Sequence, residues 1–371
     1  MKTIKFIGNE DHQKAFASAV RKNVHDYFTD NGLSTKGNLR LAIQTVVMLL
    51  LYIIPFVFIL TIPMNGWVGM LMGVIMGTGV AGIGMCVMHD AAHDSYSHKK
   101  WVNQLFGSTL YLLGSNVLNW KIQHNLLHHT YTNIEGYDQD IESKGPLRLS
   151  ENAPLKKIHY YQHIHAFFFY GLMTISRLFR EFSQLLEFNK AGIIKHLRLN
   201  GTYEYTKMVV IKILYVLVII GLPILYTSFA WWEVLIGFMI MHFVGGCILG
   251  TIFQMAHVVE GSEQMLANED GIIECEWAVH ELRTSANFAP NNKFLEYYAG
   301  GLNFQIEHHL FPNISHIHYR KIAPIVESTA KEFGYPYNLK PNFRAALQSH
   351  VVRLKELGQT DIRIAEATSA F

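Results

Sequence analysis

Residues 66–93 read GWVGMLMGVIMGTGVAGIGMCVMHDAAH and join the two features that decide the fold. The part from Gly66 to Met88 carries no charged side chain, and at about 1.5 Å per helical residue it can cross a hydrocarbon core of about 30 Å. It is also rich in glycine, as packed membrane helices often are. His89 and His93 follow directly, four residues apart and therefore on one face of a helix. The stretch predicts a membrane helix that ends in a pair of candidate metal ligands.

Three further apolar runs have the length of a membrane span. The four runs are Leu41–Pro63, Gly66–Met88, Lys207–Phe229 and Glu233–Met255. Short turns separate the first two and the last two, so each pair forms a hairpin, and the second turn carries two tryptophans where an interfacial belt would sit. Half of the residues are hydrophobic and only 16% are charged, which also favours a membrane protein. We predict an all-α integral membrane protein with four transmembrane helices in two hairpins.

Two shorter apolar stretches are harder to interpret as spans. Gln104–Trp120 is interrupted by glycine, serine and asparagine, and His163–Leu178 has a similar character. A span at Gln104–Trp120 would also put the histidines on its two sides across the bilayer from one another. We therefore expect both stretches to be interfacial or re-entrant segments.

Two more histidine clusters follow the first one along the chain. One reads His124-Asn-Leu-Leu-His128-His129, and the other reads Gln305-Ile-Glu-His308-His309. Neutral imidazole binds iron, zinc, copper and nickel alike, so residue type does not name the metal. The histidines are more numerous than one tetrahedral zinc requires, which indicates two metal ions that share a site.

The distribution of basic residues predicts the orientation in the membrane. Lysine and arginine are absent from the two hairpin tips and frequent in the other connecting segments. The positive-inside rule then places both termini, the central segment and every histidine cluster on the cytoplasmic side. One set of ligands can converge only if all of it lies on one side, so we expect a cytoplasmic helical cap that carries the two-metal site.

Cysteine usage and net charge exclude other classes of site. Cys86, Cys247 and Cys275 are three widely spaced cysteines, which form neither a disulfide framework nor a CxxC metal site. The net charge of +2 is too small to indicate a nucleic-acid partner. The first forty residues do not resemble a signal peptide, so we expect the first transmembrane helix to direct insertion.

The patterns HxxxH, HxxxHH and QxxHH, in this order and separated by membrane-length segments, resemble the three histidine boxes of the membrane fatty acid desaturases. The run Gln-Ile-Glu-His-His-Leu-Phe-Pro at 305–312 resembles the front-end subgroup, which places a new double bond between an existing one and the carboxyl end of the acyl chain. The resemblance covers about residues 40–325.

The resemblance implies two iron ions, O₂ as co-substrate and an external electron donor. It also adds His257, because desaturases carry a lone histidine after the fourth span. Some relatives have an asparagine four residues earlier, where this chain has Phe253, and Gln254 is the candidate substitute. The implied metal ligands are His89, His93, His124, His128, His129, His257, His308 and His309.

Several other side chains are candidates for binding the metals or orienting the ligands. These are Gln305, Glu307, Gln254, Asp90 and His280. Gln305 could coordinate directly, through water, or only hydrogen-bond a ligand, whereas Glu307 could accept a hydrogen bond from an imidazole ring N–H. Asp138 and Asp140 could also orient a ligand, although their position favours caps of local turns.

We predict one desaturase domain over residues 1–371, in which 41–312 form the membrane and histidine-box core. Residues 1–40 form an amphipathic arm with an apolar stripe at Phe16, Val20, Val24 and Phe28; it lies on the membrane, packs on the catalytic body, or stays solvated. Residues 313–371 are expected to form cytoplasmic helices around the histidine boxes.

The expected activity is O₂-dependent insertion of a cis double bond into a fatty acyl chain, carried on coenzyme A or in a lipid, in a delta-6 or delta-5 reaction. The alternatives are a membrane di-iron hydroxylase of lipids or alkanes and a metal transporter, although a transporter needs ionisable ligands near the middle of its spans. The chain lacks the His-Pro-Gly-Gly signature of a fused cytochrome domain, so we expect a ferredoxin, a flavodoxin or a free cytochrome as electron carrier.

Overall fold

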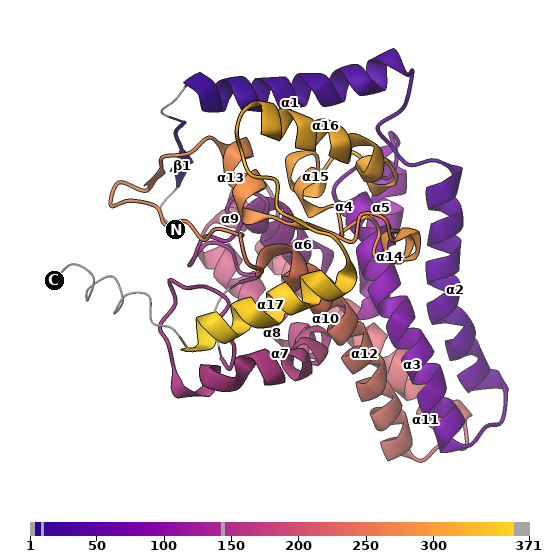
Figure 1. The fold of residues 1–371 in the computed structure, drawn as a ribbon. Helices are drawn as coiled ribbons and strands as arrows, with labels where there is room; N and C mark the ends of the chain where they lie inside the picture. Colours follow the sequence, from indigo (N-terminus) through magenta and orange to yellow (C-terminus); the bar gives the residue numbers. More distant parts are fainter. Residues whose placement is uncertain (1–3, 9–10, 142–144, 360–371) are drawn as a thin grey trace. The chain divides into compact units, whose positions relative to one another are not determined.

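The computed structural model describes residues 4–8, 11–141 and 145–359. Its described residues are mostly helical (Figure 1). They form two compact units. The first unit comprises Met1–Lys36, Gln123–Ala166 and Ile252–Phe371, and the membrane unit comprises Gly37–Ile122 and Phe167–Thr251. The assignment of both units to one functional domain stays a prediction.

Four helices are long and apolar enough to cross a membrane. They are Leu39–Thr61 (α2), Gly66–Ala92 (α3 Gly66–Gly82, π-helix η1 Ile83–Val87 and α4 Met88–Ala92), Gly201–Tyr226 (α10 Gly201–Val216, π-helix η5 Leu217–Gly221 and α11 Leu222–Tyr226) and Trp231–His257 (α12). The predicted all-α membrane fold with two hairpins is confirmed. The third helix begins six residues before the predicted run. The prediction was based on uninterrupted apolar residues, and the first turns of this helix are polar.

Close packing within the membrane unit depends on glycine. A Cβ atom at Gly77 would lie 2.6 Å from the carbonyl oxygen of Met241, and one at Gly79 would lie 2.8 Å from the backbone nitrogen of Tyr52. No other residue fits at these two positions. Glycine thus lets α3 approach α12 on one side and α2 on the other, as is common where membrane helices have no hydrophobic effect to drive their association.

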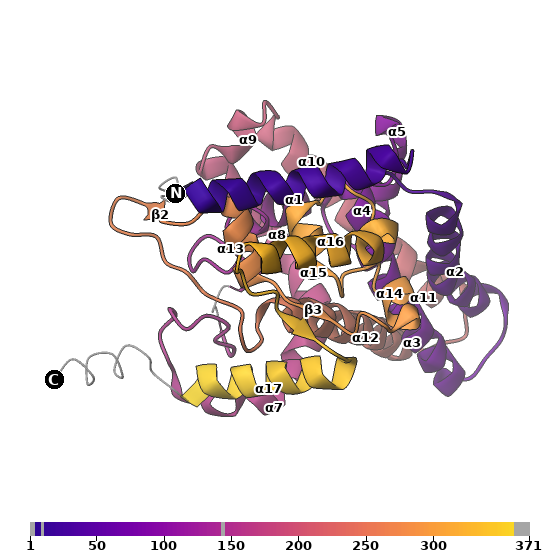
Figure 2. The ribbon, with the colours of Figure 1, turned by 45° about the horizontal axis from the view of Figure 1, so that its top comes forward.

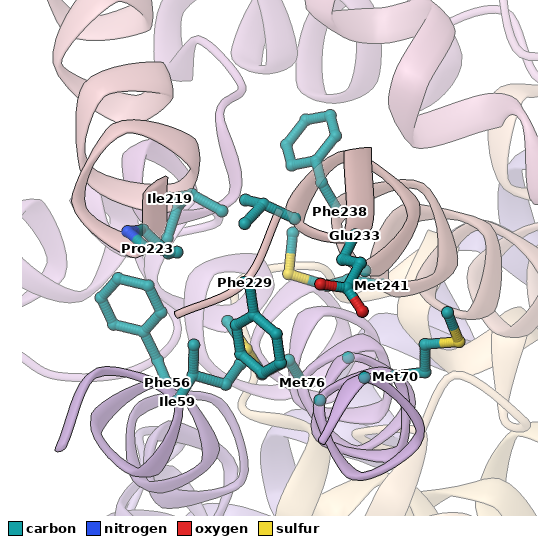
Figure 3. Close-up of a pocket in the computed structure, with 15 residues that line it drawn as sticks. Phe56, Ile59, Met70, Met76, Ile219, Pro223, Phe229, Glu233, Phe238 and Met241 are labelled. Atoms are coloured by element: carbon teal, nitrogen blue, oxygen red, sulfur yellow. The ribbon is translucent and has the colours of Figure 1, made fainter. Parts of the chain in front are cut away.

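The hairpin tips enclose a small apolar cavity in the membrane unit. Phe56, Phe229, Met70 and Met241 are among the side chains that line it (Figure 3). Its volume is about 50 Å³. Glu233 lies at this cavity and accepts a hydrogen bond from the backbone nitrogen of Ala230, which begins α12 at the second tip.

The two shorter apolar stretches consist of short or broken helices. The first contains α5 (Lys100–Gly107), the 3-10 helix η2 (Ser108–Leu113) and α6 (Val117–Trp120). Gly114 separates the last two with a φ of 75°, a conformation that ends a helix and favours glycine. The second stretch lies in α7 (Gln162–Gly171) and α8 (Met173–Lys190), which α9 (Ile193–His196) follows. Their interfacial position stays a prediction.

The first unit is built from helices with two very short parallel strand pairs. Its helices are η3 (Lys121–His128, with its first two residues in the membrane unit), η4 (Lys157–Tyr161), α1 (Asp11–Asp30), α13 (Trp277–Thr284), α14 (Lys293–Tyr298), α15 (Gln305–Leu310), η6 (His316–His318), α16 (Tyr319–Glu332) and α17 (Phe343–Gln359). Strand β1 (Lys5–Phe6) pairs with β2 (Ile272–Ile273), and β3 (Asn287–Phe288) pairs with β4 (Leu339–Lys340). The segment 360–371 of the predicted C-terminal region lies outside the described residues.

Helix α1 packs along α16 within the first unit (Figure 2). The predicted stripe of Phe16, Val20, Val24 and Phe28 is fully buried in one apolar cluster with residues of α13, α15 and α16. Residues Asp11–Asp30 thus form a helix with one buried apolar face, while the extent of the arm over residues 1–40 stays a prediction. Of the three placements that its pattern allowed, the structure shows packing on the unit that carries most of the histidines.

Candidate metal centre

The second histidine cluster lies on a π-helix. The backbone nitrogen of His129 donates to the carbonyl oxygen of His124 at 3.0 Å, which is the i→i+5 bond of a π-turn. The wider turn brings Nε2 of His129 to 3.2 Å from Nε2 of His124, while the ring of His128 stacks on that of His124 with centroids 5.2 Å apart. An ideal α-helix would have placed only His124 and His128 on one face, so the π-turn brings a third imidazole to the same place.

Helix α15 and the end of α12 supply the other predicted ligands of the first unit. His308 and His309 lie on α15, and His257 is the last residue of α12. Six of the eight predicted ligands thus meet in this unit, and all six are buried. The six are His124, His128, His129, His257, His308 and His309.

Their ring nitrogens form two groups of three. His128, His257 and His309 form one group, and His129, His308 and His309 form the other, each with its ligand atoms within 4.8 Å of one another. His309 belongs to both groups. Two overlapping sets of neutral nitrogen donors are what two neighbouring metal ions require.

In three of these rings the Nδ1 atom, which points away from the groups of converging nitrogens, is hydrogen-bonded to a carboxylate or a tyrosine hydroxyl. Nδ1 of His128 donates to Asp138 at 2.9 Å, and Nδ1 of His309 donates to Glu281 at 2.7 Å. The hydroxyl of Tyr319 lies 3.1 Å from Nδ1 of His308. With Nδ1 engaged in this way, Nε2 is left to bind a metal, as is usual for metal-binding histidines.

The Nε2 atom of His128 indicates that a metal ion fits among these histidines. This atom is buried and makes no hydrogen bond within the described residues. A buried nitrogen without a partner is costly unless something else binds it. Burial opposes the charged form of His128, but Asp138, Asp140 and Glu281 together outweigh this effect and raise the pKa of His128 to about 9. A metal ion would take the place of that proton, because it binds the neutral ring.

Gln305 lies among these ligands, whereas the hydrogen bond that Gln254 donates goes to the backbone of a neighbouring loop. The amide nitrogen of Gln305 is 2.9 Å from Nε2 of His257 and 3.3 Å from Nε2 of His309. Rotation of the amide by 180° would present its oxygen instead. Gln254 donates to the carbonyl oxygen of Asp140 at 3.3 Å, and its own oxygen is buried without a hydrogen-bond partner in the described part of the chain.

Phe253 lies four residues before His257, at the position where the resemblance led us to expect an asparagine. Its ring lies 5.1 Å from that of His128 and 5.0 Å from that of His257, measured between centroids. An apolar ring therefore packs against two of the candidate ligands at this position.

Glu307 differs from expectation. Its carboxylate accepts hydrogen bonds from Asn287 at 2.7 Å and from the hydroxyl of Tyr337 at 2.9 Å, and from no imidazole of the described residues. Glu307 lies between His308 and Gln305 in sequence, but its side chain leaves the opposite face of the short helix α15. Burial raises the pKa of Glu307 to about 7, and the two donors partly offset that effect.

His280 is also placed away from the two groups of ligands. Its Nε2 atom donates to the carbonyl oxygen of Thr132 at 2.9 Å, and burial lowers its pKa to about 4. The neutral ring links α13 to the segment that follows His129. Asp138 has both of the roles that the sequence left open, because its carboxylate accepts from the backbone nitrogens of Asn133 and Asp140 and also from His128.

His89, His93 and Asp90 belong to the membrane unit. The rings of His89 and His93 are 4.8 Å apart between centroids, as their spacing predicted. The ring of Trp120 is nearly perpendicular to both rings, and its centroid lies 5.7 Å from that of His89 and 5.8 Å from that of His93. Asp90, the candidate between them, is buried.

The sequence reasoning missed Glu281 and Tyr319. Glu281 lies 28 residues before His309, and Tyr319 lies 11 residues after His308, so neither shares a helix turn with its partner. No regular spacing connects them to the histidine boxes. The weak signal for Glu281 was its position beside the candidate His280.

We predict that replacing Glu281 with alanine lowers both metal retention and turnover by about 10- to 100-fold, the usual cost of losing a carboxylate that orients a metal-bound histidine. His309 would lose the acceptor that fixes its tautomer. The measurement is metal per purified chain and product per bound metal. Glu274→Ala, at an exposed position of the same unit, is the matched control; equal losses in both variants would contradict the role of Glu281.

Comparisons with known proteins agree with this arrangement. Residues 65–341 match the family model described as fatty acid desaturase. The chain is 34% identical over 350 residues to the sn-1 linoleoyl-lipid 6-desaturase of Synechocystis sp., with 94% of this chain and 96% of that protein covered. It is 31% identical over 358 residues to the acyl-lipid (8-3)-desaturase of Physcomitrium patens, with coverages of 96% and 73%. It is 28% identical over 362 residues to the Delta(5) fatty acid desaturase A of Dictyostelium discoideum, with coverages of 95% and 76%.

Proposed function

The chain belongs to the fatty acid desaturase family, and from this premise we propose that it inserts a cis double bond into a lipid-linked acyl chain, between an existing double bond and the carboxyl end. The two relatives named for delta-6 and delta-5 chemistry make these the two candidate positions. The observation that carries the proposal is the convergence of Gln305, His308 and His309 with His128 and His257 in one buried set.

The metals are proposed to be two iron ions. His128, His257 and His309 would hold one, and His129, His308 and the shared His309 would hold the other, with His124 beside them. We propose that His89 and His93 complete the set from the membrane unit. Bound iron would supply the activation of O₂ that removal of hydrogen from an unactivated methylene requires, since no side chain is a strong enough oxidant.

The protein's own residues would do three things at such a centre. Asp138 and Glu281 fix the tautomers of His128 and His309, because each carboxylate accepts the Nδ1 proton. Burial of the six predicted ligands in the first unit keeps bulk water away from them. The amide of Gln305 stands at the inner nitrogens of His257 and His309, where it can orient them or bind directly.

The orientation and the electron source are part of the same proposal. The positive-inside rule supports a cytoplasmic location of both termini and of the histidines. Electrons would come from a separate ferredoxin, flavodoxin or cytochrome. A metal transporter fits less well, because His242, near the middle of α12, is already bound to Tyr215 at 2.7 Å and to Thr174 at 3.1 Å.

The test is expression in a host that lacks polyunsaturated fatty acids, with candidate dienes and trienes supplied and a suitable reductase present. We expect a new double bond on the carboxyl side of an existing one, located by mass spectrometry in the lipid fraction. A hydroxy acid would identify a hydroxylase instead. A new double bond on the methyl side would contradict the front-end assignment.

A further inference from the structure

The membrane unit contains a buried ion pair that the proposed chemistry does not use. Nζ of Lys212 on α10 lies 2.8 Å from Oε2 of Glu181 on α8. Their side chains are only 8% and 1% exposed. Burying two charges costs more than their attraction returns unless further hydrogen bonds use the remaining donors and acceptors. The other partners of this pair therefore indicate what it holds.

The hydrogen-bond partners of the two charged groups lie on one short segment, Gly114–Trp120. Lys212 donates to the carbonyl oxygen of Gly114 at 2.9 Å, and Glu181 accepts from the backbone nitrogen of Asn116 at 2.9 Å. The side-chain amide of Asn119 donates to the carbonyl oxygen of Glu181 at 3.0 Å and to Gln184 at 3.2 Å. Both charged groups thus bind backbone atoms of a segment more than sixty residues away in sequence.

This segment needs such partners because its backbone is not continuous helix. A Cβ atom at Gly114 would lie 2.6 Å from the ring of Tyr215 and from a methyl of Leu178, so the chain passes very close to α10 and α8. The break leaves a carbonyl and an amide without helical partners, and an apolar surrounding offers no water to satisfy them. Lys212 satisfies the carbonyl and Glu181 satisfies the amide.

The segment ends at Trp120, whose ring contacts both histidines of the first box. The centroid distances are 5.7 Å to His89 and 5.8 Å to His93, and both interplanar angles are 79°. Asn116 caps the four-residue helix α6 by accepting from the backbone nitrogen of Asn119 at 3.0 Å, so the geometry fixed at the break extends directly to Trp120.

We infer that Glu181 and Lys212 are positioning residues that keep the indole of Trp120 packed against His89 and His93. The inference rests on the proposed function only where it concerns turnover; the placement of the indole is independent of it. The indole keeps water from the two imidazoles and limits their rotation. Without the pair, the segment moves, and the two histidines lose their fixed orientation.

The test uses the full chain labelled with 5-fluorotryptophan in lipid nanodiscs and observed by ¹⁹F NMR. The chain has six tryptophans, and the signal that Trp120→Phe removes is that of Trp120. In Glu181→Gln/Lys212→Met, which leaves no unpaired buried charge, we expect the Trp120 signal to move while the other signals stay. Glu187→Gln, at an exposed position of α8, should move none of them. If the double variant does not fold, Gln184→Leu removes the acceptor of Asn119 without touching a charge.

Turnover provides the second measurement. We expect the double variant to lose about 10- to 100-fold in product per bound metal, as for a displacement of about 1 Å near a reacting group. Combining it with Trp120→Phe should add little further loss, because both changes act through the same contact. An unmoved Trp120 signal, or fully additive losses, would overturn the inference. A moved signal in a chain that makes no double bond would leave the inference standing and refute the proposed function.

Discussion

Replacing His309 with alanine is expected to reduce desaturated product to the level of a host without the enzyme. His309 belongs to both groups of converging nitrogens, so its loss weakens both proposed metal positions at once. It would also leave Glu281 buried without its imidazole donor. The loss should exceed the roughly 100-fold upper range for residues that only orient a ligand. The measurement is product per folded chain by gas chromatography with mass spectrometry, together with iron per chain.

The matched control for this variant is His25→Ala, at an exposed position of α1 in the same unit. It should keep both product and iron. If His309→Ala retains a full complement of iron and more than a small fraction of the product, then His309 does not hold the metals.

Replacing His257 with alanine is expected to have an effect of the same size, although His257 lies outside the three boxes. Its ring is 4.8 Å from that of His128 and 4.8 Å from that of His309, between centroids. Gln305 also reaches its inner nitrogen. If His257 completes one metal position, its removal should reduce product and iron as much as removal of a histidine of the three boxes at the same position. Product and iron should therefore fall together.

The control for His257 is a second buried histidine of the same unit. His350 is fully buried and donates to the carbonyl oxygen of Val258 at 2.7 Å. Asparagine can keep that hydrogen bond, so His350→Asn should leave product and iron near the wild-type level. A His257→Ala enzyme that is as active as His350→Asn would show that His257 is a packing residue.

The membrane fold could be predicted from the sequence because its signals are local. Uncharged runs of about twenty residues give the spans, and the short turns between them give the hairpins. The stripe at Phe16, Val20, Val24 and Phe28 gave an amphipathic helix for the same reason. Its partner could not be predicted, because α16 lies about three hundred residues away and no pattern in α1 identifies it.

The candidate site was predictable in its histidines and less so in what surrounds them. The spacing of the boxes and the family resemblance identified the six rings that meet in the first unit. The π-turn that brings His124 to His129 depends on tertiary packing, which a helical period of 3.6 residues does not reveal. Glu281 and Asp138 orient their histidines from other segments, and Glu307 turns away because α15 is too short to fix a face in advance.

The central claim is that this chain holds two iron ions among imidazoles from its separate histidine boxes. The most direct test is the iron content of the purified wild-type chain grown with ⁵⁷Fe, measured by mass spectrometry of the metals and checked by Mössbauer spectroscopy. We expect two irons per chain and little zinc. One iron per chain, or zinc in its place, would contradict the claim.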